Sequence, residues 1–319
     1  PARADCPLCP TKPGSAPSEI PAQDYHVVVF ENRFPSLNAR AAQPASSVDG
    51  QEMWPERASD GRCEVVCFTS DHESRFSALD PTRARTVIEA WADRTQELMA
   101  IDSVQDVFCF ENRGEEIGVT LAHPHGQIYA YPYVPPRTAQ HVARAAEHFA
   151  ATGRDLLGDI VAAEQEADRR IVMRGEHWTA FVPAAARWPV EVHMVPHRHV
   201  LDHSQTNDAE RTELAQMYPA LLRALDHFFV GADDAPIELP YIAGWFAAPK
   251  AGNDESNGAV DPRARPRLHL QVISVMRAAG KLKYLAGSES AQGAWVSDTT
   301  PELIADRLQE VMSEMAATS

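Results

Sequence analysis

Two kinds of hydrophobic pattern alternate along the chain. Short runs rich in valine, isoleucine and aromatic residues are bounded by glycine, proline, aspartate or asparagine, which is typical of strands. These runs predict strands at residues 24–32, 63–70, 104–112, 125–134, 171–183, 190–200, 240–249 and 265–276.

Longer runs place apolar residues three and four positions apart, which predicts amphipathic helices. In residues 80–100 the apolar stripe includes Val87, Ile88 and Trp91, and Pro81 suits the first turn. The same reasoning predicts helical segments at residues 138–169, 208–230 and 300–312. Thr300 is a plausible N-cap of the last one.

Three segments show neither the strand-like runs nor the helical spacing of apolar residues. Residues 1–24 are polar and rich in proline and predict an irregular arm held against the body. Residues 35–62 predict a long loop, and residues 251–262 a mobile one. Loops of such length are uncommon unless they are functional or mobile.

The order strand, strand, helix, strand, strand occurs twice, which predicts an internal duplication. Residues 63–72 can be laid over residues 190–199, an offset of 190 − 63 = 127. Residues 26–30 match 177–181, and residues 122–128 match 268–274, which pairs His123 with His269 and His125 with Gln271. We expect an α+β fold of two tandem repeats, residues 1–137 and 138–319, each an antiparallel sheet with helices packed on it.

Charge and length narrow the possible partners. The 319 residues carry 29 basic and 45 acidic side chains, a net charge of −16, which disfavours binding to a nucleic-acid polymer. A small phosphate-bearing ligand is compatible with that charge, because a few backbone N–H groups can hold one. No apolar run reaches the ~18 residues of a membrane span. The first residues lack the pattern of a secretory signal, so we expect a cytoplasmic protein.

The five cysteines are too few and too scattered for a disulfide framework. Cys63, Cys67 and Cys109 lie in strand-like runs and predict buried free thiols. Cys6 and Cys9 are different, because C-P-L-C lies in a proline-rich stretch without a core to fill. This context favours a metal site over a redox site.

Residues 110–136 contain the largest concentration of candidate catalytic and ligand-binding residues. His123 and His125 flank Pro124, and in an extended segment both rings would lie on one face. Gly126 allows close approach of a ligand or of another backbone. Upstream, two glycines bracket a turn whose N–H groups could cradle an anion, and Gln127 adds an amide donor on the histidine face.

These motifs resemble the galactose-1-phosphate uridylyltransferase family of the histidine-triad superfamily. The residues that carry the resemblance are H-P-H-G-Q at 123–127, the preceding F-E-N-R-G, C-P-L-C, S-D-H at 70–72, E-H-W-T-A-F-V-P and G-W-F-A-A-P. The resemblance implies two histidine-triad-like repeats and makes His125 the nucleophile that attacks the α-phosphorus of a UDP-sugar. It also implies that Gln127 donates to a phosphoryl oxygen.

The resemblance further implies one structural zinc ion per chain, held by Cys6, Cys9, His72 and His123. Two thiolates and two imidazoles make a closed tetrahedral site. Many family members carry a second metal in the other half. The matching positions here are His141, Phe246, His269 and Gln271, and because phenylalanine cannot ligate we expect no second metal.

Family resemblance also predicts the substrate contacts. Arg33 stands where the family often has an acid, and Thr120 replaces the usual serine. The predicted substrate-binding residues are Asn32, Phe34, Asn112, Gly118, Thr120, Lys283, Tyr284 and Glu289. The implied ligands are UDP-glucose, UDP-galactose and hexose 1-phosphates, and a homodimer is expected because the family builds its sites across two subunits.

Three functions are compatible with this sequence. The first is ping-pong transfer of UMP from UDP-glucose to galactose 1-phosphate in galactose metabolism, through a uridylyl-histidine. The second is a related activity with another nucleobase or acceptor, such as an ADP-sugar phosphorylase, which Arg33 keeps open. The third is a non-catalytic, zinc-stabilised nucleotide-binding protein, against which His125 and Gln127 argue.

Overall fold

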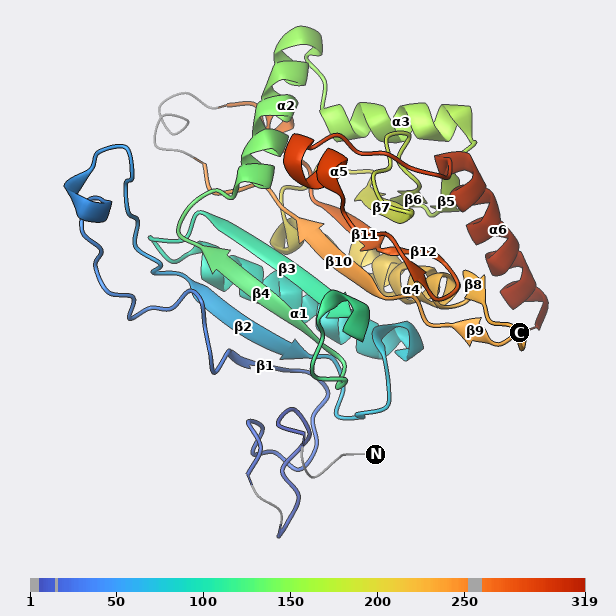
Figure 1. The fold of residues 1–319 in the computed structure, drawn as a ribbon, viewed down its shortest axis with the longest axis horizontal. Helices are drawn as coiled ribbons and strands as arrows, with labels where there is room; N and C mark the ends of the chain where they lie inside the picture. Colours follow the sequence, from blue (N-terminus) through green and yellow to red (C-terminus); the bar gives the residue numbers. More distant parts are fainter. Residues whose placement is uncertain (1–5, 15–16, 252–259, 319) are drawn as a thin grey trace.

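The computed structural model describes residues 6–14, 17–251 and 260–318. Its centre is one nine-stranded sheet in the order β1-β2-β4-β3-β10-β11-β7-β6-β5 (Figure 1). All neighbouring strands in this sheet are antiparallel. The strands are β1 Val28–Glu31, β2 Arg62–Cys67, β3 Asp106–Arg113, β4 His125–Tyr131, β5 Ile171–Arg174, β6 Trp178–Phe181, β7 Val190–Pro196, β10 Tyr241–Phe246 and β11 His269–Ser274.

The strand order confirms the predicted duplication, because it reads as a palindrome about the pair β3 and β10. β1, β2, β4 and β3 of the first repeat mirror β6, β7, β11 and β10 of the second. The expected α+β class with antiparallel strands in each half is confirmed, and the pairing of β3 with β10 joins the two halves into one continuous sheet. The division at residue 137 stays a prediction, and it falls within the first turn of helix α2 Pro136–Thr152.

The strand register corrects the offset of 127 between the repeats. His125 pairs with Cys67, and its counterpart Gln271 pairs with His193. Cys67 therefore corresponds to His193, and the offset is 193 − 67 = 126. The difference matters because a shift of one residue moves every side chain of a strand to the other face.

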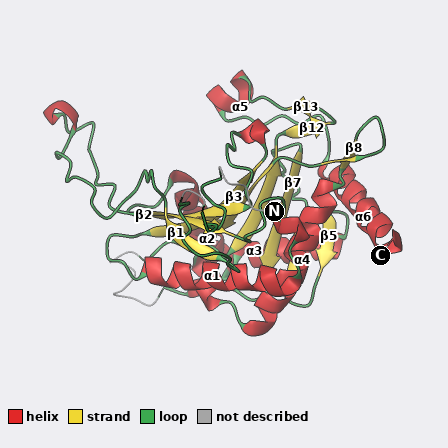
Figure 2. Cartoon of the chain, turned by 90° about the horizontal axis from the view of Figure 1, so that it is seen from below, coloured by secondary structure: helices red, strands yellow, loops and turns green. Residues whose placement is uncertain are grey.

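Helices α1 Pro81–Met99 and α4 Asp208–Asp226 pack side by side on one face of the sheet (Figure 2). Asp80 caps α1 by accepting from the N–H of Arg83, and Asn207 and Glu210 form a capping box at α4. The largest side chains of the main core lie between these helices and the sheet: Phe68, Phe76, Trp91, Trp178, Tyr218, Tyr241 and Trp245.

Several predicted elements are shorter in the structure than in the sequence pattern. The helical run 138–169 is two helices, α2 and α3 Leu156–Ala167, because Gly153 ends the first in a left-handed conformation and Asp155 caps the second. The run 171–183 is the hairpin of β5 and β6. The helix predicted to residue 230 ends at Asp226, after which β8 Phe229–Val230 pairs with β9 Pro236–Ile237.

Smaller elements complete the chain. They are the 3-10 turns η1 Val48–Gly50, η2 Phe76–Ala78, η3 Glu115–Ile117, η4 His203–Gln205 and η6 Pro262–Ala264, strands β12 Met276–Ala278 and β13 Lys281–Leu282, and helices α5 Gly287–Gln292 and α6 Pro301–Thr318. The predicted long loop before β2 extends away from the sheet and carries η1 (Figure 1). Most of the loop predicted at residues 251–262 lies outside the described residues. Over the described ranges, every helix is too short or too polar to cross a membrane.

Candidate active site and metal centre

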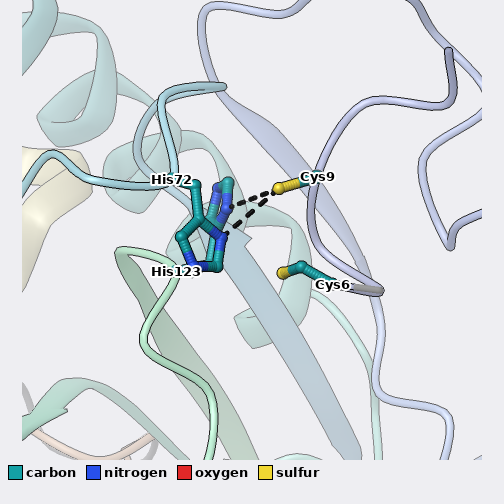
Figure 3. A group of neighbouring side chains, drawn as sticks. All are labelled: Cys6, Cys9, His72 and His123. Carbon is teal, nitrogen blue, oxygen red and sulfur yellow. Dashed lines mark hydrogen bonds between the residues drawn. The ribbon is translucent and has the colours of Figure 1, made fainter. Parts of the chain in front are cut away.

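Cys6, Cys9, His72 and His123 come together from three separate segments of the chain (Figure 3). Their ligand atoms all lie within 4.8 Å of one another. The Sγ atom of Cys9 is 3.4 Å from Nδ1 of His72 and 3.5 Å from Nδ1 of His123. Tetrahedral Zn²⁺ with bonds of about 2.3 Å to sulfur and 2.0 Å to nitrogen would separate these atoms by about 3.5 Å. The four side chains therefore fit a zinc ion.

The surroundings of His123 also fit a metal ligand. Its Nε2 lies 2.8 Å from the carbonyl oxygen of Thr69 and 2.8 Å from the hydroxyl of Tyr25. A carbonyl can only accept, so Nε2 carries the proton and Nδ1 is left for the metal. Burial lowers the pKa of His123 to about 4, which keeps the ring neutral near pH 7.

The N-terminal arm reaches this site because it packs on the outer strands of the sheet. Leu8, Ile20 and Tyr25 form a small cluster with Val65 and Cys67 of β2. The hydroxyl of Tyr25 also donates to the carbonyl oxygen of Leu8, inside C-P-L-C. This cluster places Cys6 and Cys9 against the two histidines.

His125 begins β4, two residues after the metal ligand. Its Nδ1 lies 2.7 Å from the carbonyl oxygen of His123 and must donate to it, so the proton is on Nδ1 and Nε2 keeps its lone pair. Burial lowers the pKa of His125, which favours the neutral ring. Gly126 is required here, since an added Cβ would lie 2.8 Å from the carbonyl oxygen of Phe110.

A cavity of about 510 Å³ opens beside His125 at this end of the sheet. Among the predicted site residues it is lined by Asn112, Thr120, His72, His123 and His125. Its wall includes the turn from Gly114 to Ala122, in which Gly114 and Gly118 have φ of 105° and 85°. These conformations favour glycine. The N–H groups of Ile117, Gly118 and Val119 donate to carbonyl oxygens within the turn, so an anion would meet donors from residues 120–122 that line the cavity. Gly118 and Gln127 are close in sequence to residues that line the cavity, but they do not line it themselves.

The predicted nucleoside contacts lie apart from this cavity. Asn32 follows β1, and its N–H donates to the carbonyl oxygen of Cys63, four positions along β2 from the partner of His125. At about 3.4 Å per residue, that is about 14 Å along the strand. Phe34 is 83% exposed and Arg33 pairs with Glu19, so this segment forms no enclosed base pocket.

The predicted hexose contacts also lie outside the cavity. Lys283 and Glu289 form an ion pair at 3.3 Å, in which Glu289 is buried and Lys283 is partly buried. Tyr284 between them in sequence is 81% exposed. The substrate roles of Asn32, Phe34, Lys283, Tyr284 and Glu289 remain predictions.

The four positions expected to lack the second metal do come together. The ring of Phe246 stacks on that of His269 with centroids 5.3 Å apart, and His141 lies 5.1 Å from Phe246. Nε2 of Gln271 is 3.0 Å from Nε2 of His269. The guanidinium of Arg137 lies 4.8 Å above the Phe246 ring and donates to Gln271. The cationic side chain of Arg137 therefore lies against the positions where family members hold the second metal.

Some residues that line the cavity could not be predicted from the sequence as site residues. Arg75 lies on the segment that follows His72, and residues 238–240 belong to the second repeat, far away in sequence. Arg113 was inside the F-E-N-R-G motif, but nothing in the motif distinguished its role. The pairing of β3 with β10 brings this part of the second repeat to the cavity.

Known proteins match almost the entire chain. The model of the N-terminal domain of galactose-1-phosphate uridyl transferase matches residues 2–135, and that of its C-terminal domain matches residues 141–319. The galactose-1-phosphate uridylyltransferase of Streptomyces lividans is 45% identical over 96% of this chain and 78% of its own length. That of Thermotoga maritima is 32% identical over 99% of this chain and 92% of its own.

Solved structures agree with these matches. A structure described as that of a uridylyltransferase superposes with a TM-score of 0.84 at 29% identity, covering 97% of this chain and 92% of the other. An ADP-glucose phosphorylase from Arabidopsis thaliana, with a TM-score of 0.71 at 21% identity, shares the fold over 89% of this chain and 82% of its own. The chain is therefore a transferase of the galactose-1-phosphate uridylyltransferase family.

Proposed function

We propose that this chain transfers UMP from UDP-glucose to galactose 1-phosphate through a covalent intermediate on Nε2 of His125. The observation that carries this proposal is the hydrogen bond from Nδ1 of His125 to the carbonyl oxygen of His123. It fixes the tautomer whose Nε2 lone pair is free, in a ring that lines the cavity. A positioned, neutral imidazole is a competent nucleophile near pH 7.

In the first half-reaction Nε2 attacks the α-phosphorus of UDP-glucose. The P–Nε2 bond forms, the bond from the α-phosphorus to the bridging oxygen breaks, and glucose 1-phosphate leaves with that oxygen and the electron pair. No proton transfer is needed, because the leaving group is a stable phosphate anion. The imidazole becomes cationic, and the carbonyl oxygen of His123 stabilises the proton held on Nδ1.

The second half-reaction reverses these steps with another acceptor. A phosphate oxygen of galactose 1-phosphate attacks the uridylyl phosphorus, the P–Nε2 bond breaks, and His125 regains its lone pair. Asn112 and Thr120 line the cavity beside His125 and would donate to the reacting phosphate. Gln127, on the same face of β4 as His125, adds an amide donor to a non-bridging oxygen.

Zinc, bound by Cys6, Cys9, His72 and His123, would supply rigidity to the strand start that carries His125. All four positions of a tetrahedral ion are taken by protein ligands, so the ion has no open position for substrate. We also propose that the enzyme is a cytoplasmic homodimer. The separation of Lys283, Tyr284 and Glu289 from the His125 cavity supports a second subunit that contributes them.

The test is labelling by UDP-glucose in the absence of acceptor. The wild type should accumulate an acid-labile uridylyl group, and His125→Gly should not, because the attacking atom is gone. Loss of a covalent nucleophile commonly lowers the rate by several orders of magnitude. Added imidazole should partly restore turnover and release free uridylyl-imidazole.

Two control variants make the result specific. His227→Gly removes an exposed histidine at the C-cap of α4, where glycine is well tolerated, and should label like the wild type. Gln127→Ala should slow labelling without abolishing it. Label on His125→Gly would contradict the proposal, and adenylyl label from ADP-glucose in preference to uridylyl label would assign a different nucleobase.

A further inference from the structure

Arg113 is the last residue of β3 and directly precedes the glycine turn that lines the His125 cavity. Its side chain is mostly buried, with 15% of its surface exposed. A cation this far from water and this close to a phosphate-binding turn needs a reason, because burying a charge is costly unless it is paired.

The partners of Arg113 come from the second repeat. It forms an ion pair with Asp226, the last residue of α4, and its guanidinium lies 4.8 Å from the ring centroid of Tyr241 in β10. Asp226 also accepts a bond of 2.7 Å from the hydroxyl of Ser77. Tyr241 in turn donates to the carboxylate of Glu111, 3.0 Å away on β3. Arg113 thus fastens the end of β3 to α4 and β10.

The turn itself also rests on the second repeat. At Gly114 an added Cβ would lie 2.6 Å from Cβ of Pro240, the residue before β10. The turn therefore has little freedom on that side, and its starting point is set by the Arg113 contacts. One nitrogen of Arg113, Nη1, is buried without a hydrogen-bond partner among the described residues. A pair optimised only for stability would satisfy that group.

We propose that Arg113 is a positioning residue for phosphoryl transfer: through Asp226 and Tyr241 it fixes the turn from Gly114 to Ala122 against the second repeat, so that the turn's donors meet the phosphate attacked by His125. This inference rests on the function proposed above. It gives the second repeat, which has glutamine in place of the nucleophile, a part in the chemistry of the first. Arginine can hold the ion pair with Asp226 while its planar guanidinium lies over the ring of Tyr241, which the compact ammonium of lysine cannot do.

The experiment uses the double variant Arg113→Met, Asp226→Leu. Removing both charges together avoids leaving one of them buried and unpaired, so the chain should fold and keep its metal. We expect the single-turnover rate of uridylyl label formation on His125 to fall roughly 10- to 100-fold, because a misplacement of about 1 Å can have that effect. The loss should appear in kcat as well as in kcat/KM.

A matched control is the pair Arg94 and Glu64, which joins α1 to β2 through two bonds of 2.9 and 2.7 Å away from the cavity lining. Arg94→Met, Glu64→Leu should label at the wild-type rate even if its melting temperature falls. A conservative variant, Arg113→Lys, keeps the charge but loses the planar guanidinium over the ring of Tyr241, and should remain slow.

Wild-type rates in the double variant would overturn the inference, and so would full recovery in Arg113→Lys, which would make the charge alone sufficient. An equal slowing in the Arg94 control would also overturn it, since any lost ion pair would then do the same. Failure of the proposed function looks different, because in that case the wild type itself would acquire no label.

Discussion

His125 and Gln271 occupy equivalent positions in the two repeats, but their side chains lie in opposite environments. His125 lines an open cavity and has a free ring nitrogen. Gln271 is buried, is bonded to His269 and accepts from Arg137. The glutamine amide is a poor nucleophile, and its oxygen is already engaged, so of these two residues only His125 can offer a free ring nitrogen to a substrate.

His203 lies in surroundings that strongly disfavour its protonated form. It is 2% exposed, its ring lies 4.7 Å from that of Trp245, and neither ring nitrogen has a partner among the described residues. Burial, reinforced by the positive charge of Arg211, lowers the pKa of His203 to about 3. The unfolded chain, with an ordinary pKa near 6.5, therefore binds the proton first as the pH falls.

We expect His203→Leu to stabilise the protein, because it removes two buried unsatisfied nitrogens, each unfavourable by about 1 kcal/mol or more. The gain should grow by about 2 kcal/mol between pH 7 and pH 5, since the wild type loses stability below pH 6.5 and the variant lacks that loss. Denaturant unfolding at the two pH values measures both effects. The exposed His26 provides the control, and a variant less stable than the wild type at pH 5 would contradict this account.

At the scale of elements, the N-terminal arm connects the metal site to the outer strands of the sheet. Its described residues pack on β2 through a small cluster that includes Leu8 and Ile20. Such an arm is expected to depend on the ion, as small metal-stabilised segments do. It in turn contacts His123, two residues before the proposed nucleophile His125.

The double change Cys6→Ser, Cys9→Ser should therefore remove the metal and lower the melting temperature by at least about 5 °C. Elemental analysis should give about one zinc per wild-type chain, the content of one closed site. Cys109→Ser is the control, because it alters a buried thiol outside the site and should keep the metal. A metal-free protein with the wild-type melting temperature would show that the arm is held by its packing alone.

The sequence predicted the helices and strands themselves better than it predicted where they end and which other segments they pack against. The strands of the main sheet followed from their apolar runs, and the set of four metal ligands followed from the family resemblance. The break between α2 and α3 at Gly153 and the short hairpin of β8 with β9 were not predicted. Left-handed helix caps and short hairpins leave little periodic signal in the sequence. The cavity wall from Glu238 to Pro240 depends on a ladder between segments more than a hundred residues apart, which local pattern cannot reveal.

For the whole molecule, the pairing of β3 with β10 is the junction between the repeats. Each repeat has its own strands and its own packed helix, so the two should associate when made as separate chains. We expect residues 1–134 and 135–319, cut between β4 and α2, to co-purify after co-expression and to regain uridylyl labelling of His125.

Ala243→Asp is the control for that association, because it places a charge at a buried position of β10 opposite Glu111. This variant should prevent co-purification of the two fragments, since a buried unpaired charge is strongly unfavourable. Fragments that associate equally well with Ala243→Asp, or that never associate, would show that the junction does not act as an interface.

The same junction sets the order in which the protein can fold during synthesis. β1 to β4 and all four metal ligands precede residue 132, so the first repeat can form its ladders before the second is made. The partner of β3 is complete only at residue 246, which is 246 − 113 = 133 residues after β3 ends. At about 5 to 20 residues per second, the edge of β3 stays open for about 7 to 27 s on the ribosome. During that interval an exposed strand edge can pair with a neighbouring nascent chain, so slow translation of the second repeat favours aggregation over folding.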